Sequence, residues 1–169
     1  IIAGVVAGPA SAVGAVTEMM KLDGAAADPH MVWLLDRGLR TLDVRVRRHN
    51  ENALAVARFL EGRREVSRVL YPGLESHPDH GRARELMPAG SGGMVSFVLR
   101  GGGGAANRVV DALRLVQVAP SLWGVESLIS QPRYTSHKGL AAAVRRDLGI
   151  PDGFLRLSVG IEDAQDVIA

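Results

Sequence analysis

The sequence predicts an α/β fold in which short buried strands alternate with amphipathic helices. Runs of β-branched and aliphatic residues, such as residues 66–71 and Met94–Leu99, are each followed by turn residues, a pattern typical of strands. Residues 31–61 instead carry apolar side chains at three- and four-residue steps, which is typical of a helix with one buried face. The 169 residues are 47% hydrophobic and 22% charged, so the chain is able to bury a core.

The amino-terminal part is predicted to consist of one strand and two helices. The apolar residues 1–6 predict a short buried strand, and residues 12–22 predict a weak helix. After a loop over residues 24–29, residues 31–61 predict one long helix of about 40 Å, because only Gly38 interrupts the pattern. The apolar face of this helix consists of Leu35, Leu39, Leu42, Val46, Ala53, Ala57 and Leu60. Such a helix is long enough to connect two domains.

The carboxy-terminal part is predicted to alternate strands with shorter helices. A domain boundary is expected near Gly62, so that residues 1–61 end one domain and supply the connecting helix. Residues 62–169 then form a second, carboxy-terminal α/β domain. The strands expected there are residues 66–71, Met94–Leu99, 116–119 and 154–159, and the helices are residues 81–87, residues 105–115 and the first turns of one near the end of the chain.

Charge and composition argue against several partners. The formal net charge of +2 is too small to predict nucleic-acid binding, which depends on many unneutralised basic residues. The apolar residues before Glu18 are too few to span a membrane and lack the basic start of a secretion signal, so we expect no membrane association. The sequence given contains no cysteine, which excludes disulfides and thiolate metal sites within it, and we expect a cytoplasmic location.

The most basic segment lies on the long predicted helix. Five arginines occur between positions 37 and 48, but acidic residues lie among them, and helical spacing puts Asp43 within reach of Arg40 and Arg47. We therefore expect an ion-paired surface or a subunit interface here. Nucleic-acid binding by this face is the weaker alternative.

Two further motifs are interpreted as ordinary loops. The glycines of AGSGG and RGGGG lack the fixed spacing between a strand and a helix that a phosphate-binding loop needs. His77 and His80 stand three residues apart beside a proline, and no third ligand is evident. We therefore expect neither phosphate binding nor a metal site at these positions.

Two segments are not explained by packing alone. Ser121 follows Pro120 at the end of a predicted strand, a location where functional loops gather. Arg156 lies between two leucines on the last predicted strand, and a guanidinium in that setting needs an anionic partner. A carboxylate on a ligand would match its planar fork as well as a carboxylate of the chain would, so both interpretations stay open here. The structural candidates for that partner are Glu126, Glu162 and Asp163.

Five ordered segments identify a resemblance to a known family. They are WLLDRGLRTLDVRVRRHNENALAVARFLE, VLYPGLESHPDH, GSGGMVSFVL, SLWGVESLISQPRYTSH and GIPDGFLRLSVGIED. Together they resemble the carboxy-terminal part of the Cys/Met-metabolism family of pyridoxal-phosphate (PLP) enzymes, which includes cystathionine γ-synthase, cystathionine γ-lyase and methionine γ-lyase. The match extends over essentially the whole chain, and five motifs in the same order make it specific.

The resemblance implies a PLP fold-type I, aspartate-aminotransferase-like architecture. Residues 1–61 would end the large PLP-binding domain and supply the interdomain helix, and residues 62–169 would form the carboxy-terminal domain. The implied activity is a γ-elimination or γ-replacement in trans-sulfuration, on cystathionine, methionine or O-acylhomoserine. The implied partners are this amino-acid substrate and further copies of the chain in a homotetramer.

The resemblance also assigns roles to residues of the two unexplained segments. The arginine matching Arg156 holds the substrate α-carboxylate in this family, and the serine matching Ser121 assists it. Pro120, Leu122 and Trp123 become candidates for the wall of the active site. Trp123 is a departure, because the family commonly has a glycine after the Ser-Leu pair, and an indole there would narrow the mouth of the site or pack against a lid.

The largest departure concerns the lysine that forms the Schiff base with the cofactor. Neither Lys21 nor Lys138 matches it, so we expect it upstream of the segment that matches residues 1–6, together with most of the residues that hold pyridoxal phosphate. No catalytic residue is then expected in this chain, which would be a piece of a longer enzyme. The alternative is a non-catalytic truncated module that folds and oligomerises without cofactor.

Overall fold

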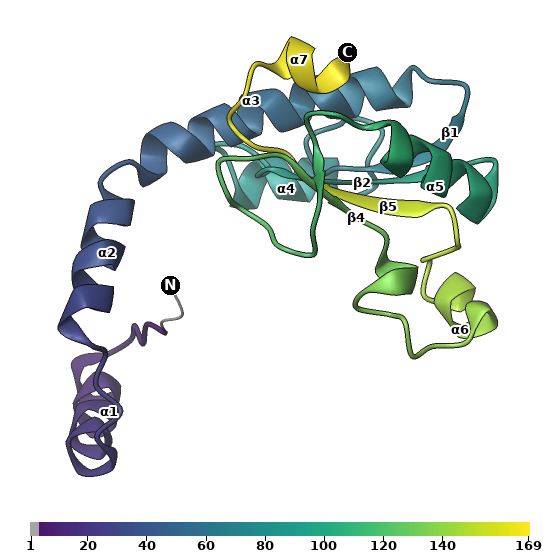
Figure 1. Cartoon of the computed structure of the whole chain (residues 1–169). Coiled ribbons are helices and arrows are strands. Elements are labelled where there is room, and N and C mark those ends of the chain that lie inside the picture. The colour runs from purple at the N-terminus through teal and green to yellow at the C-terminus, as the bar shows by residue number, and fades with distance from the viewer. Residues whose placement is uncertain (1–3) are drawn as a thin grey trace. The chain divides into compact units, whose positions relative to one another are not determined.

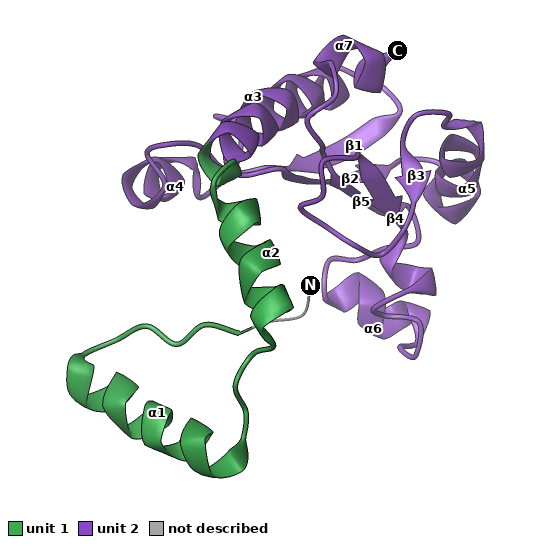
Figure 2. Cartoon of the chain, turned by 60° about the vertical axis from the view of Figure 1, so that its left-hand side comes forward, with its two compact units in different colours: residues 1–43 green, residues 44–169 purple. Residues whose placement is uncertain are grey.

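The computed structural model describes residues 4–169 and divides into two compact units. Unit 1 is Ile1–Asp43 and unit 2 is Val44–Ala169 (Figure 2). The division falls near the start of a helix rather than at Gly62, and the assignment of residues 1–61 and 62–169 to two domains stays a prediction. No helix among residues 4–169 is both long and apolar enough to cross a membrane.

Unit 1 contains two helices, α1 (Ala10–Asp23) and α2 (Pro29–Leu39). Helix α2 begins after Asp28, whose Oδ1 accepts a hydrogen bond from the backbone N–H of His30 at 2.9 Å. Helix α1 is the predicted weak helix, and neither helix contains a buried residue. The strand predicted over residues 1–6 is absent from residues 4–6, which are exposed and unpaired, and its first three positions lie outside the described residues.

The prediction of a single long helix over residues 31–61 is wrong. Helix α2 ends at Leu39, a turn covers Arg40 and Thr41, and α3 (Leu42–Glu61) is a separate helix. Gly38 lies just before this turn and the β-branched Thr41 lies within it, and both are weak helix formers. The apolar spacing continues through the turn without a change of period, so it gave no sign of the break.

Unit 2 is built on a five-stranded mixed sheet with the order β1-β2-β5-β4-β3. All neighbours are antiparallel except β3 and β4, which are parallel. The strands are β1 (Val66–Leu70), β2 (Met94–Leu99), β3 (Gln117–Val118), β4 (Leu128–Ser130) and β5 (Phe154–Ser158). The central strand β5 therefore lies between β2 and β4 (Figure 1).

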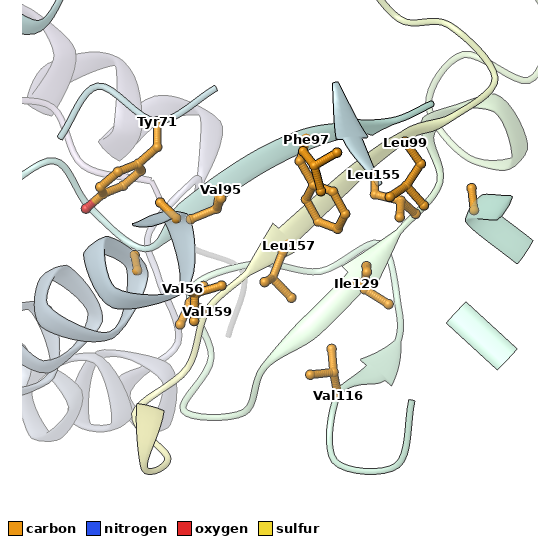
Figure 3. Packing of buried hydrophobic residues seen from close by; sticks show 14 of the residues in the cluster. Val56, Tyr71, Val95, Phe97, Leu99, Val116, Ile129, Leu155, Leu157 and Val159 are labelled. Carbon is orange, nitrogen blue, oxygen red and sulfur yellow. The ribbon is translucent and has the colours of Figure 1, made fainter. Parts of the chain in front are cut away.

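The hydrophobic core lies on one face of this sheet. Leu155 and Leu157 of β5 point into it because alternate side chains of a strand share a face (Figure 3). Three helices pack against them: α3 contributes Val56, α5 (Gly102–Ala112) contributes Val110, and α7 (Ala164–Ile168) contributes Val167. The intervening residue Arg156 and the following Ser158 lie on the opposite face.

The predicted α/β class is confirmed, and most of the expected strands and helices are present, including α4 (His80–Leu86). Three elements were not predicted: β4, the 3₁₀-helix η1 (Pro132–Tyr134) and α6 (Ala142–Asp147). Strand β4 is only three residues long and buried on both faces, so it shows no alternation of polar and apolar residues. Helix α5 also begins at Gly102, inside the glycine run that was expected to be a loop.

Candidate functional site

Arg156 occupies the middle of the central strand. Its Cα pairs with Ser96 on β2 and with Ser130 on β4, so two small side chains flank it on the face away from the core. The residue is half-buried. Because the neighbouring strands place only serines beside it, the guanidinium is not enclosed by large side chains of the sheet.

The guanidinium of Arg156 contacts only neutral groups of the described chain. Its Nη2 donates to the backbone carbonyl of Pro120 at 2.7 Å and to that of Ser121 at 3.3 Å. Its Nε is buried and has no hydrogen-bond partner. A buried donor without a partner is uncommon in a folded protein, because it loses its bonds to water and gains nothing in return.

None of the three carboxylates considered as structural partners forms an ion pair with Arg156 among residues 4–169. The Glu162 carboxylate instead accepts hydrogen bonds from the backbone N–H and the hydroxyl of Ser127. Asp163 caps α7 by accepting from the N–H of Gln165 at 2.8 Å. Glu126 makes no ion pair with Arg156 either. The guanidinium of Arg156 therefore has no carboxylate partner among residues 4–169.

The structure places the main chain of Ser121 beside the guanidinium of Arg156. The carbonyl of Ser121 accepts from the guanidinium, whereas its hydroxyl makes no hydrogen bond within the described residues and is exposed. This hydroxyl is free to donate to a bound ligand. Whether Ser121 and Arg156 bind a substrate carboxylate stays a prediction.

The loop that holds Ser121 is fixed to the end of β5 by buried polar side chains. The N–H of Trp123 donates to the Ser158 hydroxyl at 3.0 Å, and the Ser127 hydroxyl accepts from the N–H of Gly160 at 2.9 Å. The same hydroxyl donates to Glu162 at 2.9 Å. Because Ser127 and Ser158 are almost wholly buried, these bonds are shielded from water.

Helix α3 holds the other side of this junction with two buried polar residues. His49 Nδ1 donates to the carbonyl of Val159 at 2.7 Å. Asn52 Nδ2 donates to the carbonyls of Gly160 at 3.0 Å and Glu162 at 2.7 Å. Sequence reasoning missed both residues. The sequence did contain a signal. Between Val46 and Ala53 the side of the helix that faces the core is occupied by His49 and Asn52 instead of apolar residues.

The three candidate wall residues are all exposed to some degree. Pro120 contributes its carbonyl to Arg156, while Leu122 is 46% exposed. The ring of Trp123 packs edge-on against that of His49, with centroids 5.6 Å apart.

Tyr71 is a buried titratable residue of the same unit. Its hydroxyl donates to the carbonyl of Gly92 at 2.9 Å, and burial raises the pKa of Tyr71 to about 12.

The remaining candidates behave as surface residues. Lys21 is exposed and pairs with Glu18 at 2.7 Å, and Lys138 is exposed in a loop. His77 Nδ1 accepts from the N–H of Asp79, and no cluster of three potential metal ligands occurs in the part of the chain that the structure describes.

The basic segment over residues 37–48 carries ion pairs in the described chain. Arg40 pairs with Asp36 at 2.9 Å, one helical turn earlier. Arg48 lies 3.6 Å from Glu51 and 4.0 Å from Asp163. These pairs neutralise part of the positive charge that this segment would need in order to bind the phosphates of a nucleic acid.

Known proteins match this chain closely. It is 38% identical over all 169 residues to cystathionine gamma-synthase 1, chloroplastic, of Nicotiana tabacum, of which it covers 31%. It is 48% identical over 145 residues, 86% of this chain, to cystathionine gamma-synthase of Mycobacterium leprae, of which it covers 36%. It is 44% identical to cystathionine gamma-lyase of Dictyostelium discoideum over 86% of this chain and 38% of that protein.

A solved structure confirms the likeness in three dimensions. The crystal structure of cystathionine gamma synthase from Xanthomonas oryzae pv. oryzae, in complex with aminoacrylate and cysteine, matches with a TM-score of 0.73 and 49% identity. The match covers 78% of this chain and 34% of that one, and it agrees with the predicted fold-type I architecture. This chain thus spans about a third of the length of the relatives it matches.

A family model agrees with these individual matches. The model described as Cys/Met metabolism PLP-dependent enzyme matches residues 1–169, which is every residue of the chain. The resemblance found in the five sequence segments is therefore confirmed along the full sequence. The chain belongs to the family of Cys/Met metabolism PLP-dependent enzymes.

Proposed function

We propose that the intact protein is a PLP-dependent trans-sulfuration enzyme and that this chain supplies the site for the substrate carboxylate. The proposed reaction is γ-elimination or γ-replacement on cystathionine, methionine or O-acylhomoserine. The observation that carries the proposal is the Arg156 guanidinium, which has a buried, unpartnered Nε and no carboxylate partner in the described chain. Relatives named cystathionine gamma-synthase, gamma-lyase and beta-lyase support the reaction class, and β-elimination is the competing outcome.

In this proposal Arg156 binds and orients the amino acid. The carbonyls of Pro120 and Ser121 hold Nη2, so that the two N–H groups of Nη1, which has no hydrogen-bond partner in the described chain, are left to donate to a carboxylate. The exposed Ser121 hydroxyl adds a third donor. Fixing the carboxylate fixes the direction of the Cα–H bond that must break. Full positioning of reacting groups lowers a barrier by roughly 7 to 11 kcal/mol, and this contact would supply a few kcal/mol of that effect.

Bound pyridoxal phosphate supplies the electron sink for the charge that develops at Cα. We propose that the lysine and most of the residues that hold this cofactor lie outside the present sequence, since Lys21 and Lys138 are both exposed. A cytoplasmic location and a homotetramer complete the proposal. The cytoplasmic location rests on the absence of cysteine from the sequence, and the homotetramer rests on family membership.

The test is Arg156→Ala in the full-length enzyme, with Arg68→Ala as the matched control. Arg68 is also a strand arginine that donates to a backbone carbonyl, that of Gly149 at 3.0 Å, but it lies on the edge strand β1. We expect Arg156→Ala to raise KM for the amino acid by about 10- to 100-fold, the value of charged hydrogen bonds of about 1.5 to 3 kcal/mol, with the cofactor still bound. The control should leave KM unchanged.

An equal KM in the Arg156→Ala variant and the parent enzyme would remove the assignment. A separate measurement addresses the non-catalytic alternative. If the polypeptide in its source has a mass of only 17.9 kDa and gains no visible absorbance with pyridoxal phosphate, the chain acts as a module without the cofactor.

A further inference from the structure

Trp123 has an unusual backbone conformation. Its φ is +62°, and it is the only residue other than glycine with a positive φ among residues 4–169. Residues with a bulky side chain avoid this region because the Cβ atom crowds the backbone. A residue persists there only where its surroundings hold it, and such residues gather at functional sites.

Three contacts hold Trp123 in this conformation. Its N–H donates to the hydroxyl of Ser158 at 3.0 Å. Its indole covers Gly92 so closely that a Cβ atom on that glycine would lie 2.9 Å from Cη2. Its ring meets the ring of His49 at an angle of 79°, and His49 is in turn bonded to the carbonyl of Val159. The indole therefore ties the loop to α3 and to Gly92, while the backbone N–H of Trp123 ties it to β5.

The same loop holds the guanidinium of Arg156. The guanidinium donates to the carbonyls of Pro120 and Ser121, and Ser121 lies two residues before Trp123. Ser158, whose hydroxyl accepts from the N–H of Trp123, lies two residues after Arg156 on β5 and thus on the same face of the sheet. The loop is consequently attached to β5 at two neighbouring points, one through Arg156 and one through the backbone of Trp123.

Burial alone does not account for the tryptophan. Its side chain is 41% exposed, so it removes less apolar surface from water than a core residue of its size would. A glycine would adopt this φ without strain. The contacts by which Trp123 holds the loop therefore explain this strained residue better than its contribution to the hydrophobic core does.

We propose that Trp123 is a positioning residue for substrate binding. Its indole fixes the loop so that the carbonyls of Pro120 and Ser121 face Nη2 of Arg156 and leave Nη1 for the ligand. This inference rests on the proposed function, because it takes Arg156 to be the group that binds the substrate carboxylate.

The experiment is a double-mutant cycle in the full-length holoenzyme, with KM and kcat measured for the amino-acid substrate. Trp123→Asn removes the indole but tolerates the backbone conformation, because asparagine adopts a positive φ readily, and we expect it to raise KM about tenfold, the value of one misplaced charged hydrogen bond, with kcat within about twofold. Trp123→Phe keeps an aromatic ring over Gly92 and should restore most of the affinity. Val125→Ala, an exposed position in the same loop, is the control and should leave KM unchanged.

The cycle separates this inference from the proposed function. In an Arg156→Ala background, Trp123→Asn should have no further effect on KM, because it acts through the arginine. An unchanged KM in Trp123→Asn alone, or the same tenfold rise with and without Arg156, would overturn the positioning role while leaving the role of Arg156 intact. If Arg156→Ala itself leaves KM unchanged, the proposed function fails and this inference fails with it.

Discussion

Asn52 should be one of the most costly polar residues of α3 to replace. It is 1% exposed, and its amide donates to the carbonyls of Gly160 and Glu162 at 3.0 and 2.7 Å. Asn52→Ala leaves the buried carbonyl of Gly160 without this donor, whereas the part-buried carbonyl of Glu162 keeps Nη2 of Arg48 at 3.4 Å. Since each unsatisfied buried group costs about 1 to 3 kcal/mol, we expect the free energy of unfolding to fall by about 3 kcal/mol.

The matched control is Asn50→Ala, on the same helix. Asn50 also makes two hydrogen bonds to backbone groups, those of Ala89 at 3.0 Å and Gly92 at 2.7 Å, but it is only partly buried. Water replaces its bonds more readily, so its removal should cost about 1 kcal/mol. Urea unfolding of the full-length protein, followed by the change in tryptophan fluorescence, measures both variants. Equal losses within about 0.5 kcal/mol would refute the reasoning that burial decides the cost.

Two further perturbations test the core and its titration. Leu155→Ala removes a fully buried side chain of the central strand, and we expect a loss of about 2 to 5 kcal/mol in the same unfolding assay; a loss below 1 kcal/mol would contradict the packing described. The pKa of Tyr71 is raised from 10.0 to about 12 by burial, so the unfolded state loses its proton first and stability should decline as pH rises from about 10 to 12. Tyr71→Phe should remove this part of the decline, and an identical pH profile in both proteins would argue against a buried neutral hydroxyl.

The sequence was sufficient to predict those parts of the fold that follow from local patterns. Strands β2 and β5 alternate in burial as their side chains require, which placed Arg156 on a strand with its side chain opposite to those of Leu155 and Leu157. The proximity of Ser121 to Arg156 was predicted only through the family resemblance, because these positions are 35 residues apart.

The parts that were missed depend on tertiary contacts. The turn at Arg40 and Thr41 leaves the apolar period unchanged, so nothing in the spacing separates two helices from one. The roles of His49 and Asn52 depend on carbonyls more than 100 positions away, and a pattern within one helix does not show them. The positive φ of Trp123 likewise follows from contacts with distant residues.

The most direct test of the carboxylate site is a crystal structure of the intact enzyme with a bound amino-acid ligand. The account predicts that the α-carboxylate oxygens accept hydrogen bonds from Arg156 at about 2.7 to 2.9 Å, while Nη2 keeps its contact with the carbonyl of Pro120. A carboxylate bound by other residues, with Arg156 still contacting only backbone carbonyls, would contradict it.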